Sequence, residues 1–419
     1  MEKLQVFGGK KLKGSIRISG SKNSSLPILA STLLSKKKIK ITNLPKVKDI
    51  QTMLLLLRSL GSAIKFDKKN KIIEINNSKN IKSFASYNLV KTMRAGILVL
   101  GPLLARLKKA KVSLPGGCAI GARPVDMHLK ALSKLGAKYK IKNGYIFAEA
   151  KKGLIGNKIK FPKISVGATE NLIIAACFAK GETILSNCAI EPEICDLINF
   201  LNKMGCNIKW IKKRTIKILG VKNTKIIKYK IMPDRIETGT YMIASILTNG
   251  NLKIKCSDPK IVNTEIDILR KIGAKIKIKN KLIKISRGKK LKKIKLKTSP
   301  YPGFPTDLQA QIMVLLCKAN GTSEISEKIF ENRFMHASEL NRMGAKIKIF
   351  GNRAKIEGNI KFEPAELMAT DLRASVSLIL AALTTEGKSI INRIYHLDRG
   401  YEEIEKKLTN VGAKIKRQG

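Results

Sequence analysis

The chain has few aromatic residues, few histidines and no long apolar run. Phe, Trp and Tyr make up 5% of the 419 residues, too few to suggest platforms on which nucleic-acid bases stack. The three histidines lie far apart in the sequence, so we expect no metal site, and we expect no cofactor. The longest apolar stretch, residues 96–105, is about half a bilayer span, which excludes a membrane-spanning helix.

The seven cysteines are odd in number and form no CxxC pair, which argues against a disulfide framework or a zinc site. The first residues carry no apolar signal segment. We therefore expect a soluble cytoplasmic protein. With 44% hydrophobic residues, a chain of 419 residues exceeds one hydrophobic core, so we expect two domains of about 200 residues each.

Acidic residues are scarce: 83 Lys and Arg against 30 Asp and Glu give a formal net charge of +53. One interpretation is nucleic-acid binding. The other interpretation is that the lysines lie on solvated faces and have no partner. An A/T-rich coding sequence would raise the content of lysine, isoleucine and asparagine together. Residues 36–38 and 289–293 are lysine-rich runs between apolar segments without interleaved aromatics, which favours the second interpretation. We expect no nucleic-acid partner and no membrane association, and an anionic small substrate suits the same charge.

The strongest structural signal is a unit that occurs six times. Each copy contains a glycine followed by an alternating strand, as in Ile272-Gly-Ala-Lys-Ile-Lys277. The six glycines are 75, 69, 68, 71 and 68 residues apart: Gly61, Gly136, Gly205, Gly273, Gly344 and Gly412. An amphipathic helix ends at the glycine, two strands form a hairpin, and a third strand leads to a buried helix and a closing strand. The pattern predicts an α/β fold of βαβαββ units.

Six copies divide evenly into two domains of three. The last copy ends without its second hairpin strand, and residues 3–7 could supply this strand by pairing near residues 414–416. We therefore predict one domain of residues 21–231 and another of residues 1–20 plus 232–419, joined by two chain connections. Small ligands often bind at domain interfaces, so we expect the ligand cleft there.

One loop combines a cysteine with glycines and an arginine: Leu114-Pro-Gly-Gly-Cys-Ala-Ile-Gly-Ala-Arg-Pro-Val-Asp-Met-His128. Glycines allow such a segment to approach a ligand closely. The loop leads into a predicted helix, whose N-terminal N–H groups together with Arg123 favour an anion. The same surroundings lower the pKa of a thiol, so Cys118 is either a reactive thiol or an inert loop cysteine.

Charged residues stand at the starts of the buried helices, where the repeat does not explain them: Lys22 with Asn23, Arg94, Glu170, Arg235 with Glu237, Asp307, and Asp371 with Arg373. The alternative to a functional role is an N-cap or a salt bridge, although lysine and arginine are poor caps. Asp307 is either an N-cap or a general base. Ser165, Lys163 and nearby backbone N–H groups could hold a phosphate.

Several long motifs together resemble a known family: residues 19–27, 92–95, 115–126, 301–307, 330–336, 371–375 and 396–399. They closely resemble UDP-N-acetylglucosamine 1-carboxyvinyltransferases, a family of enolpyruvyl transferases, and the resemblance extends over the whole chain. It implies two inverse α/β barrel domains, each of three βαβαββ repeats, with a ligand cleft between them. Ser21, Ser24 and Ser25 stand where the family more usually has alanine.

The resemblance implies transfer of the enolpyruvyl group of phosphoenolpyruvate to the 3′-hydroxyl of UDP-N-acetylglucosamine, with release of phosphate. This is the first committed step of peptidoglycan precursor synthesis, and thus of cell-wall growth, cell shape and division. Lys22, Asn23, Arg123 and Arg399 match the positions that bind phosphoenolpyruvate, and Lys22 and Arg399 also belong to the catalytic set. Cys118 matches the group that donates a proton to C3 or forms a covalent adduct, and Asp307 matches the group that takes the hydroxyl proton.

The resemblance also assigns the nucleotide-sugar contacts, which comprise Arg94, Arg123, Pro124, Val125, Asp126, Met127, Lys163, Ile164, Ser165, Val166, Asp307 and Ile329. Asp371 and Arg373 match supporting positions.

Two alternatives remain from the sequence. The first is an enzyme like 5-enolpyruvylshikimate-3-phosphate synthase, which shares the six-unit plan but lacks the cysteine loop. The second is a non-catalytic binding protein on the same scaffold, because a fold does not fix a function. The joint presence of Cys118, Asp307 and the cations argues against the second.

Overall fold

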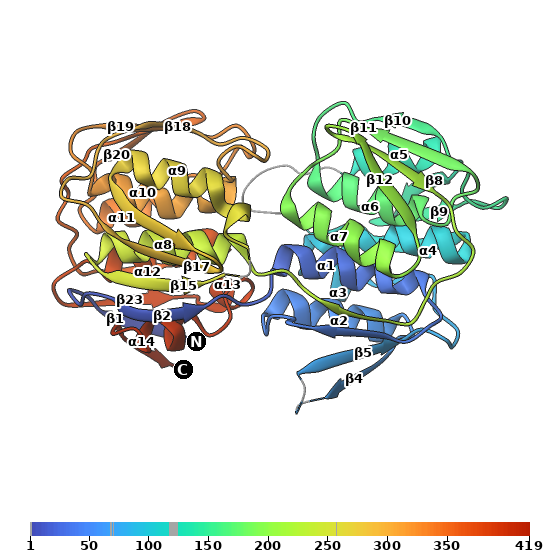
Figure 1. The fold of residues 1–419 in the computed structure, drawn as a ribbon, viewed down its shortest axis with the longest axis horizontal. Helices are drawn as coiled ribbons and strands as arrows, with labels where there is room; N and C mark the ends of the chain where they lie inside the picture. Colours follow the sequence, from blue (N-terminus) through green and yellow to red (C-terminus); the bar gives the residue numbers. More distant parts are fainter. Residues whose placement is uncertain (1, 68, 70, 117–124, 257) are drawn as a thin grey trace. The chain divides into compact units, whose positions relative to one another are not determined.

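The computed structural model describes residues 2–67, 69, 71–116, 125–256 and 258–419. Within these ranges the chain forms two compact units (Figure 1). The Lys22 unit comprises residues 20–116 and 125–232, and the Asp307 unit comprises residues 2–19 and 233–419.

The helices of the Lys22 unit include two 3₁₀ segments, labelled η. They are α1 (Lys22–Ser31), η1 (Thr32–Leu34), α2 (Lys48–Ser59), α3 (Tyr87–Val90), η2 (Arg94–Val99), α4 (Leu100–Leu107), α5 (Asp126–Lys134), α6 (Val166–Ala176) and α7 (Pro192–Lys203). Its strands are β3 (Ile39–Thr42), β4 (Ala63–Asp67), β5 (Ile72–Asn76), β6 (Phe84–Ala85), β7 (Lys109–Ser113), β8 (Lys138–Lys142), β9 (Tyr145–Glu149), β10 (Lys158–Lys160), β11 (Glu182–Ser186), β12 (Asn207–Lys212), β13 (Thr215–Leu219) and β14 (Ile227–Lys230).

The helices of the Asp307 unit are α8 (Arg235–Leu247), η3 (Pro259–Val262), α9 (Asn263–Ile272), η4 (Thr306–Leu308), α10 (Gln309–Cys317), α11 (His336–Arg342), α12 (Leu372–Ala382), α13 (Tyr395–Asp398) and α14 (Ile404–Thr409). Its strands are β1 (Lys3–Phe7), β2 (Lys13–Arg17), β15 (Asn251–Lys255), β16 (Ala274–Lys279), β17 (Leu282–Arg287), β18 (Lys295–Lys297), β19 (Ser323–Ser326), β20 (Ile347–Phe350), β21 (Arg353–Ile356), β22 (Glu366–Met368), β23 (Lys388–Asn392) and β24 (Lys414–Gln418).

The described strands form six four-stranded sheets, and all six share one topology. In each sheet a short outer strand runs parallel to its neighbour, and an antiparallel hairpin completes the set. The orders in the Lys22 unit are β14-β3-β5-β4, β6-β7-β9-β8 and β10-β11-β13-β12. The orders in the Asp307 unit are β16-β17-β15-β2, β18-β19-β21-β20 and β22-β23-β1-β24. The repeat read from the sequence is therefore a structural repeat.

The six repeated glycines all have positive φ, between 87° and 113°. Glycine adopts this left-handed region without the steric penalty of a Cβ, so it ends the amphipathic helix and turns the chain into the hairpin. In that hairpin the side chains alternate between the two faces of the sheet. In β17, for example, Ile283 and Ile285 are buried and Lys284 is exposed.

The core of each unit lies where the inner sheet faces meet apolar helices. Every residue of α8 and of α10 is buried, and so are most residues of α6 and α12, because these helices are apolar almost all round. Helices α10 and α12 contact each other in the Asp307 unit, as α4 and α6 do in the Lys22 unit. Figure 1 shows these helices running between the sheets of their own unit. Polar residues at the starts of such helices are thus the exceptions that need an explanation.

The predicted role of the N-terminal strand is confirmed. Strand β1 pairs with β24, with Gln5 opposite Lys416 and Phe7 opposite Lys414, and it pairs with β23 on its other side. Figure 1 shows this blue strand beside the red C-terminal end of the chain. The N-terminus therefore completes the last repeat.

The two chain connections are fixed by backbone hydrogen bonds inside each unit. Asp234 N–H donates to the carbonyl of Ser19 at 2.9 Å in the Asp307 unit, and Ser21 N–H donates to the carbonyl of Met232 at 2.7 Å in the Lys22 unit. Gly20 lies between these bonds, and a Cβ there would be 1.7 Å from a carbonyl oxygen of Asn43. Only glycine fits at this position.

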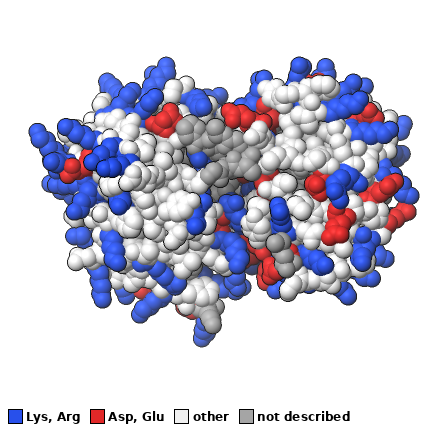
Figure 2. Space-filling model, turned by 180° about the vertical axis from the view of Figure 1, so that it is seen from behind, with Lys and Arg blue, Asp and Glu red and all other residues white. Residues whose placement is uncertain are grey.

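On the face seen in Figure 2, the positive charge is distributed rather than gathered in one patch. Figure 2 shows Lys and Arg side chains scattered over the face in view, with fewer Asp and Glu among them. Within the ranges the structure describes, no helix is long and apolar enough to cross a membrane.

Candidate active site

Lys22 is the first residue of α1, and its ammonium group is held by a carboxylate that the sequence analysis did not identify. Its Nζ lies 3.1 Å from Oδ2 of Asp49, in the first turn of α2, and the two side chains are 12% and 7% exposed. Ser21 caps α1 by accepting the N–H of Ser24. A nearly buried ion pair with a hydrogen bond holds the lysine side chain in a fixed place, as an anion-binding group requires.

Helix α1 is anchored to α7 by a buried polar network. The hydroxyl of Ser24 donates to Asp196, and the hydroxyl of Tyr229 donates to the same carboxylate at 2.6 Å. Burial raises the pKa of Asp196, whereas these two hydrogen bonds oppose the rise. Ser24 is one of the serines at positions where the resembling family more usually has alanine. Because the Ser24 hydroxyl binds Asp196, it helps to hold α1, the helix that carries Lys22, in place.

Within the Lys22 unit, the described residues assigned to the nucleotide sugar lie at three helix starts. Arg94 begins η2, Asp126 and Met127 begin α5 after the buried Val125, and Val166 begins α6. Ser165 is the N-cap of α6 and accepts the N–H of Ala168 at 3.3 Å, so its side chain has a structural role as well. Lys163 is exposed and Ile164 half-buried just before this cap.

Cys118, Arg123 and Pro124 lie outside the described residues. The six described cysteines are unpaired. Burial raises the pKa of Cys177, Cys188, Cys195, Cys256 and Cys317, to about 12 for Cys188 and Cys317. These five thiols are poor nucleophiles at neutral pH because so little thiolate is present.

Asp307 is held by two buried arginines of its own unit. Its Oδ1 lies 2.8 Å from Nη2 of Arg333, and its Oδ2 lies 2.9 Å from Nη2 of Arg373. Both arginine side chains are 5% exposed, whereas that of Asp307 is 27% exposed. Burial lowers the pKa of Arg373, but Asp307 and other neighbours outweigh it and raise the pKa overall. The arrangement presents one accessible carboxylate on a rigid cationic support.

The N-cap interpretation of Asp307 is wrong. Asp307 lies within η4, α10 begins at Gln309, and neither element has a side-chain cap, since the carboxylate binds arginines instead. For Asp371 the structural alternative is correct. It caps α12 by accepting the N–H groups of Arg373 at 2.7 Å and Ala374 at 3.1 Å. Asp371 thereby orients the helix that carries Arg373.

Ile329 and the turn that carries Asp307 are linked by a buried carboxylate. Glu327, 2% exposed, accepts the hydroxyl of Thr306 at 2.9 Å and the N–H of Ile329 at 2.8 Å. Glu327 was not expected in the site from the sequence, and Arg333 was not assigned to it. Arg333 lies inside one of the resembling motifs, which was an available signal, whereas no sequence pattern pointed to Glu327.

Of the remaining charged helix starts, Arg235 and Glu237 are paired within the Asp307 unit. Arg235 lies 3.5 Å from Glu265, and Glu237 accepts Lys407 at 2.5 Å and the N–H of Ser19 at 2.8 Å. Burial raises the pKa of Glu237, although Lys407 opposes this. Burial, with neighbouring Glu193 and Glu191, raises the pKa of Glu170 well above its usual value.

Arg399 directly follows α13 in the Asp307 unit and is half-buried. Burial lowers the pKa of the neighbouring His396, and the positive charge of Arg399 lowers it further. Asn23, in α1, is likewise half-buried.

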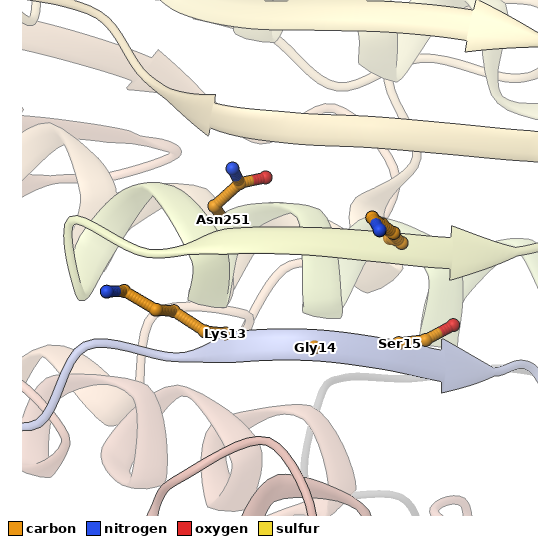
Figure 3. Close-up of a pocket in the computed structure, with 5 residues that line it drawn as sticks. Lys13, Gly14, Ser15 and Asn251 are labelled. Carbon is orange, nitrogen blue, oxygen red and sulfur yellow. The ribbon is translucent and has the colours of Figure 1, made fainter.

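One pocket of the Asp307 unit lies apart from the residues expected to act. It is lined by Lys13, Gly14 and Ser15 of β2 and by Asn251 and Lys253 of β15, which run side by side (Figure 3). None of these residues was expected in the site. Among the residues that the structure describes, no group of three or more His, Cys, Asp or Glu could hold a metal ion.

Comparison with known proteins places the chain in a family. The sequence model of EPSP synthase (3-phosphoshikimate 1-carboxyvinyltransferase) matches residues 6–408. The chain belongs to this family. The chain shares its fold with the enolpyruvyl transferase NikO from Streptomyces tendae, with a TM-score of 0.92 and 22% sequence identity. The match covers 100% of this chain and 99% of that one. The predicted class, two inverse α/β barrels, is confirmed at the level of fold.

Two curated relatives of this family member are more similar in sequence. A UDP-N-acetylglucosamine 1-carboxyvinyltransferase from Pelagibacter ubique (strain HTCC1062) is 73% identical over 417 residues, which cover 100% of both chains. A protein of the same name from Trichlorobacter lovleyi is 50% identical, over 100% of this chain and 99% of its own length. The resemblance read from the motifs is confirmed.

Proposed function

We propose that this enzyme transfers the enolpyruvyl group of phosphoenolpyruvate to the 3′-hydroxyl of UDP-N-acetylglucosamine and releases phosphate. The observation that carries the proposal is the 73% identity, over its full length, to a curated protein named for this activity. The substrates are small molecules, and the reaction would be the first committed step of peptidoglycan precursor synthesis. Such a step belongs in the cytoplasm, where its nucleotide-sugar substrate is made.

The proposed roles follow from charge. Phosphoenolpyruvate carries a carboxylate and a phosphate, so it needs several cations, and arginine can bind either group through two parallel hydrogen bonds. We assign Lys22, Arg123 and Arg399 to these groups, with Asn23 beside them. The position of Lys22 against Asp49, 3.1 Å away and nearly buried, supports its role as a fixed cation.

The proposed chemistry is an addition followed by an elimination. Cys118 gives a proton to C3 of phosphoenolpyruvate, which makes C2 electrophilic. The 3′-hydroxyl oxygen then bonds to C2 while Asp307 takes the hydroxyl proton. In the elimination the bond from C2 to the phosphate oxygen breaks, and phosphate leaves with the proton that Asp307 took. C3 returns a proton to the Cys118 thiolate, so that the double bond is restored.

The surroundings of Asp307 support its role as the base. Two guanidinium groups at 2.8 and 2.9 Å hold the carboxylate in a fixed position, as a base that must meet one hydroxyl requires. Asp307 is also more exposed than either arginine, so a substrate hydroxyl can reach it. We further propose that the two units are the two domains of the enzyme and that each supplies reacting groups.

Phosphate release, measured with each substrate omitted in turn, tests the proposal. We expect release that requires both phosphoenolpyruvate and UDP-N-acetylglucosamine. Release that depends on shikimate 3-phosphate instead would favour an activity like that of EPSP synthase, the name of the matching family. Tight binding of both substrates without release would favour a non-catalytic binding protein.

A further inference from the structure

A fully buried asparagine joins three of the helix starts on which the proposed function depends. Asn171 lies in α6 and is 0% exposed. Its Oδ1 accepts the N–H of Gly101 at 2.8 Å, and its Nδ2 lies 3.2 Å from the carbonyl oxygen of Ile97 and 3.1 Å from Nδ1 of His128. One amide, carried by α6, therefore contacts η2, α4 and α5.

The first two contacts place the amide at a break in a helix. Ile97 lies in η2 and Gly101 in α4, where the chain changes from 3₁₀ to α geometry. The two residues are four apart, the spacing that normally closes an α-helical turn, and a side chain at such a site sets the geometry of the junction. A Cβ on Gly101 would be 2.3 Å from the Asn171 amide oxygen, so glycine is required for this approach.

These two contacts also fix the orientation of the amide. Gly101 N–H can only donate, so it requires the oxygen of Asn171, and the Ile97 carbonyl can only accept, so it requires the nitrogen. The nitrogen therefore also faces His128, where it can only donate. Nδ1 of His128 must accept, and the proton of the neutral imidazole belongs on Nε2.

We propose that Asn171 is a positioning residue for the nucleotide-sugar site and that it holds His128 as the Nε2–H tautomer. This one amide connects three helices, which begin at Arg94, at Asp126 and after the cap Ser165. In each helix the connected residue lies within two turns of the start. Only the identity of the ligand at these three helix starts, the nucleotide sugar, rests on the proposed function. Asn171 itself acts through them and touches no substrate.

The tautomer is tested first, because that measurement needs neither activity nor a substitution at Asn171. The protein has three histidines, so ¹⁵N labelling of histidine side chains gives three sets of ring signals, and His128→Gln identifies the set of His128. In the wild-type protein near pH 8 we expect a proton on Nε2 and a bare Nδ1. A proton on Nδ1 of the neutral ring would overturn the proposal.

The positioning role is tested with Asn171→Asp, which keeps the acceptor for Gly101 and removes both donors. We expect His128 to take a proton on Nδ1, and KM for UDP-N-acetylglucosamine to rise about tenfold or more while KM for phosphoenolpyruvate stays within about twofold. Gly101→Ala, which displaces the amide without adding charge, should give the same split of KM values.

The matched control is Asn77→Asp. Asn77 is also 0% exposed in the Lys22 unit, and its Nδ2 donates to the carbonyl of Thr32 at 2.8 Å, away from the three helix starts. It should lower the melting temperature and leave both KM values and the His128 signals unchanged. Equal rises of KM in both asparagine variants, or an unchanged KM and His128 spectrum in Asn171→Asp, would overturn the proposal. Failure of the proposed function would instead appear as wild-type protein without transferase activity, with the tautomer result intact.

Discussion

Each unit has a buried side-chain amide that connects its own central helices. The electrostatic surroundings of the two amides differ. In the Lys22 unit the amide of Asn171 contacts two backbone groups and a histidine. In the Asp307 unit the amide of Gln311 donates to the carbonyl of Asp307 at 3.0 Å and to the hydroxyl of Tyr401 at 3.1 Å. Tyr401 in turn lies under Arg373, whose guanidinium carbon is 5.4 Å from the ring centre.

The difference shows how one repeat supports two kinds of site. The Lys22 unit uses a neutral amide to set the positions of helix starts. The Lys22 unit also has the nearly buried pair of Lys22 with Asp49. The Asp307 unit has several such pairs, which include those of Arg333 and Arg373 with Asp307 and of Lys407 with Glu237. Removing one partner of a buried pair leaves the other charge uncompensated. The Asp307 unit should therefore couple activity to stability more strongly than the Lys22 unit does.

The largest effect is expected for Asp307→Asn. The change removes the proposed base and leaves Arg333 and Arg373 without their carboxylate. We expect phosphate release to fall by about 10²–10⁴-fold, and the free energy of unfolding to fall by about 3 kcal/mol because a largely buried pair is broken. Kinetics and urea unfolding measure the two effects.

Glu74→Gln provides the control for Asp307→Asn. It removes the carboxylate that pairs with the exposed Lys38 and Lys40 in the Lys22 unit. The loss should be below about 1 kcal/mol, with unchanged kinetics, because pairs in water contribute little. Equal losses of stability in the two variants would contradict the contrast between the units.

Acid should destabilise the Asp307 unit through His336. This side chain is 1% exposed, and burial lowers its pKa from 6.5 to about 4. Between these values the unfolded chain binds the proton and the folded chain does not, so stability falls as the pH drops from about 6.5 to 4. The loss is on the order of 3 kcal/mol.

Urea unfolding of wild type and His336→Gln across this pH range isolates the effect of His336. Buried carboxyls with raised pKa values, such as Glu170 and Glu237, contribute in the opposite direction but are common to both proteins. Only the wild type should carry the extra acid sensitivity. Parallel pH profiles would show that His336 does not titrate as its burial implies.

Cys118→Ser should remove activity without the loss of folding stability that is expected for Asp307→Asn. Serine matches the shape of cysteine but hardly ionises, so we expect a fall of about 100-fold or more in enolpyruvyl transfer, with UDP-N-acetylglucosamine still bound. A thiol-alkylating epoxide that mimics phosphoenolpyruvate should label Cys118 first, and faster with nucleotide sugar bound.

The control cysteines for Cys118 are Cys177 and Cys317, which are buried with raised pKa values. Their alanine variants should lose little rate, because they behave as small hydrophobic side chains. Wild-type activity in Cys118→Ser at saturating substrates would exclude the assignment.

The cations assigned to the substrate should matter more than the charges on the solvated surface, whose removal should have the smallest effect. Arg123→Ala should weaken phosphoenolpyruvate binding by about 1.5–3 kcal/mol, the usual value for one charge-assisted hydrogen bond. Neutralising Lys289 and Lys290 together should leave substrate affinity almost unchanged, because they belong to the distributed surface charge. Equal weakening in a binding titration would mean that the whole surface, rather than selected cations, holds the substrate.

Much of the fold could be predicted from the sequence, because the repeat records local rules. A glycine in the left-handed region and an alternating hairpin recur six times, and the incomplete last copy implied the pairing of β1 with β24. The helix starts were also predictable, since each carries charged residues on an otherwise apolar segment. Motifs of this length were enough to suggest the family.

The contacts within the site were harder to predict, because they join residues that are distant in the chain. Asp307 meets Arg333 after 26 residues and Arg373 after 66. Asn171 looks like any polar residue of a buried helix until Gly101 and His128 are brought to it. Periodicity reports which face of an element is buried, whereas it carries no information on which polar side chains meet there.

The most direct test of the account is the structure of the reaction product. Phosphoenolpyruvate labelled with ¹³C at C2 and UDP-N-acetylglucosamine are incubated with the wild-type enzyme, and the product is examined by NMR. We predict one enol ether carbon attached to the 3′-oxygen of the sugar and one phosphate released for each product formed. A label attached to any other oxygen of the sugar, or phosphate released without an enol ether, would contradict the account.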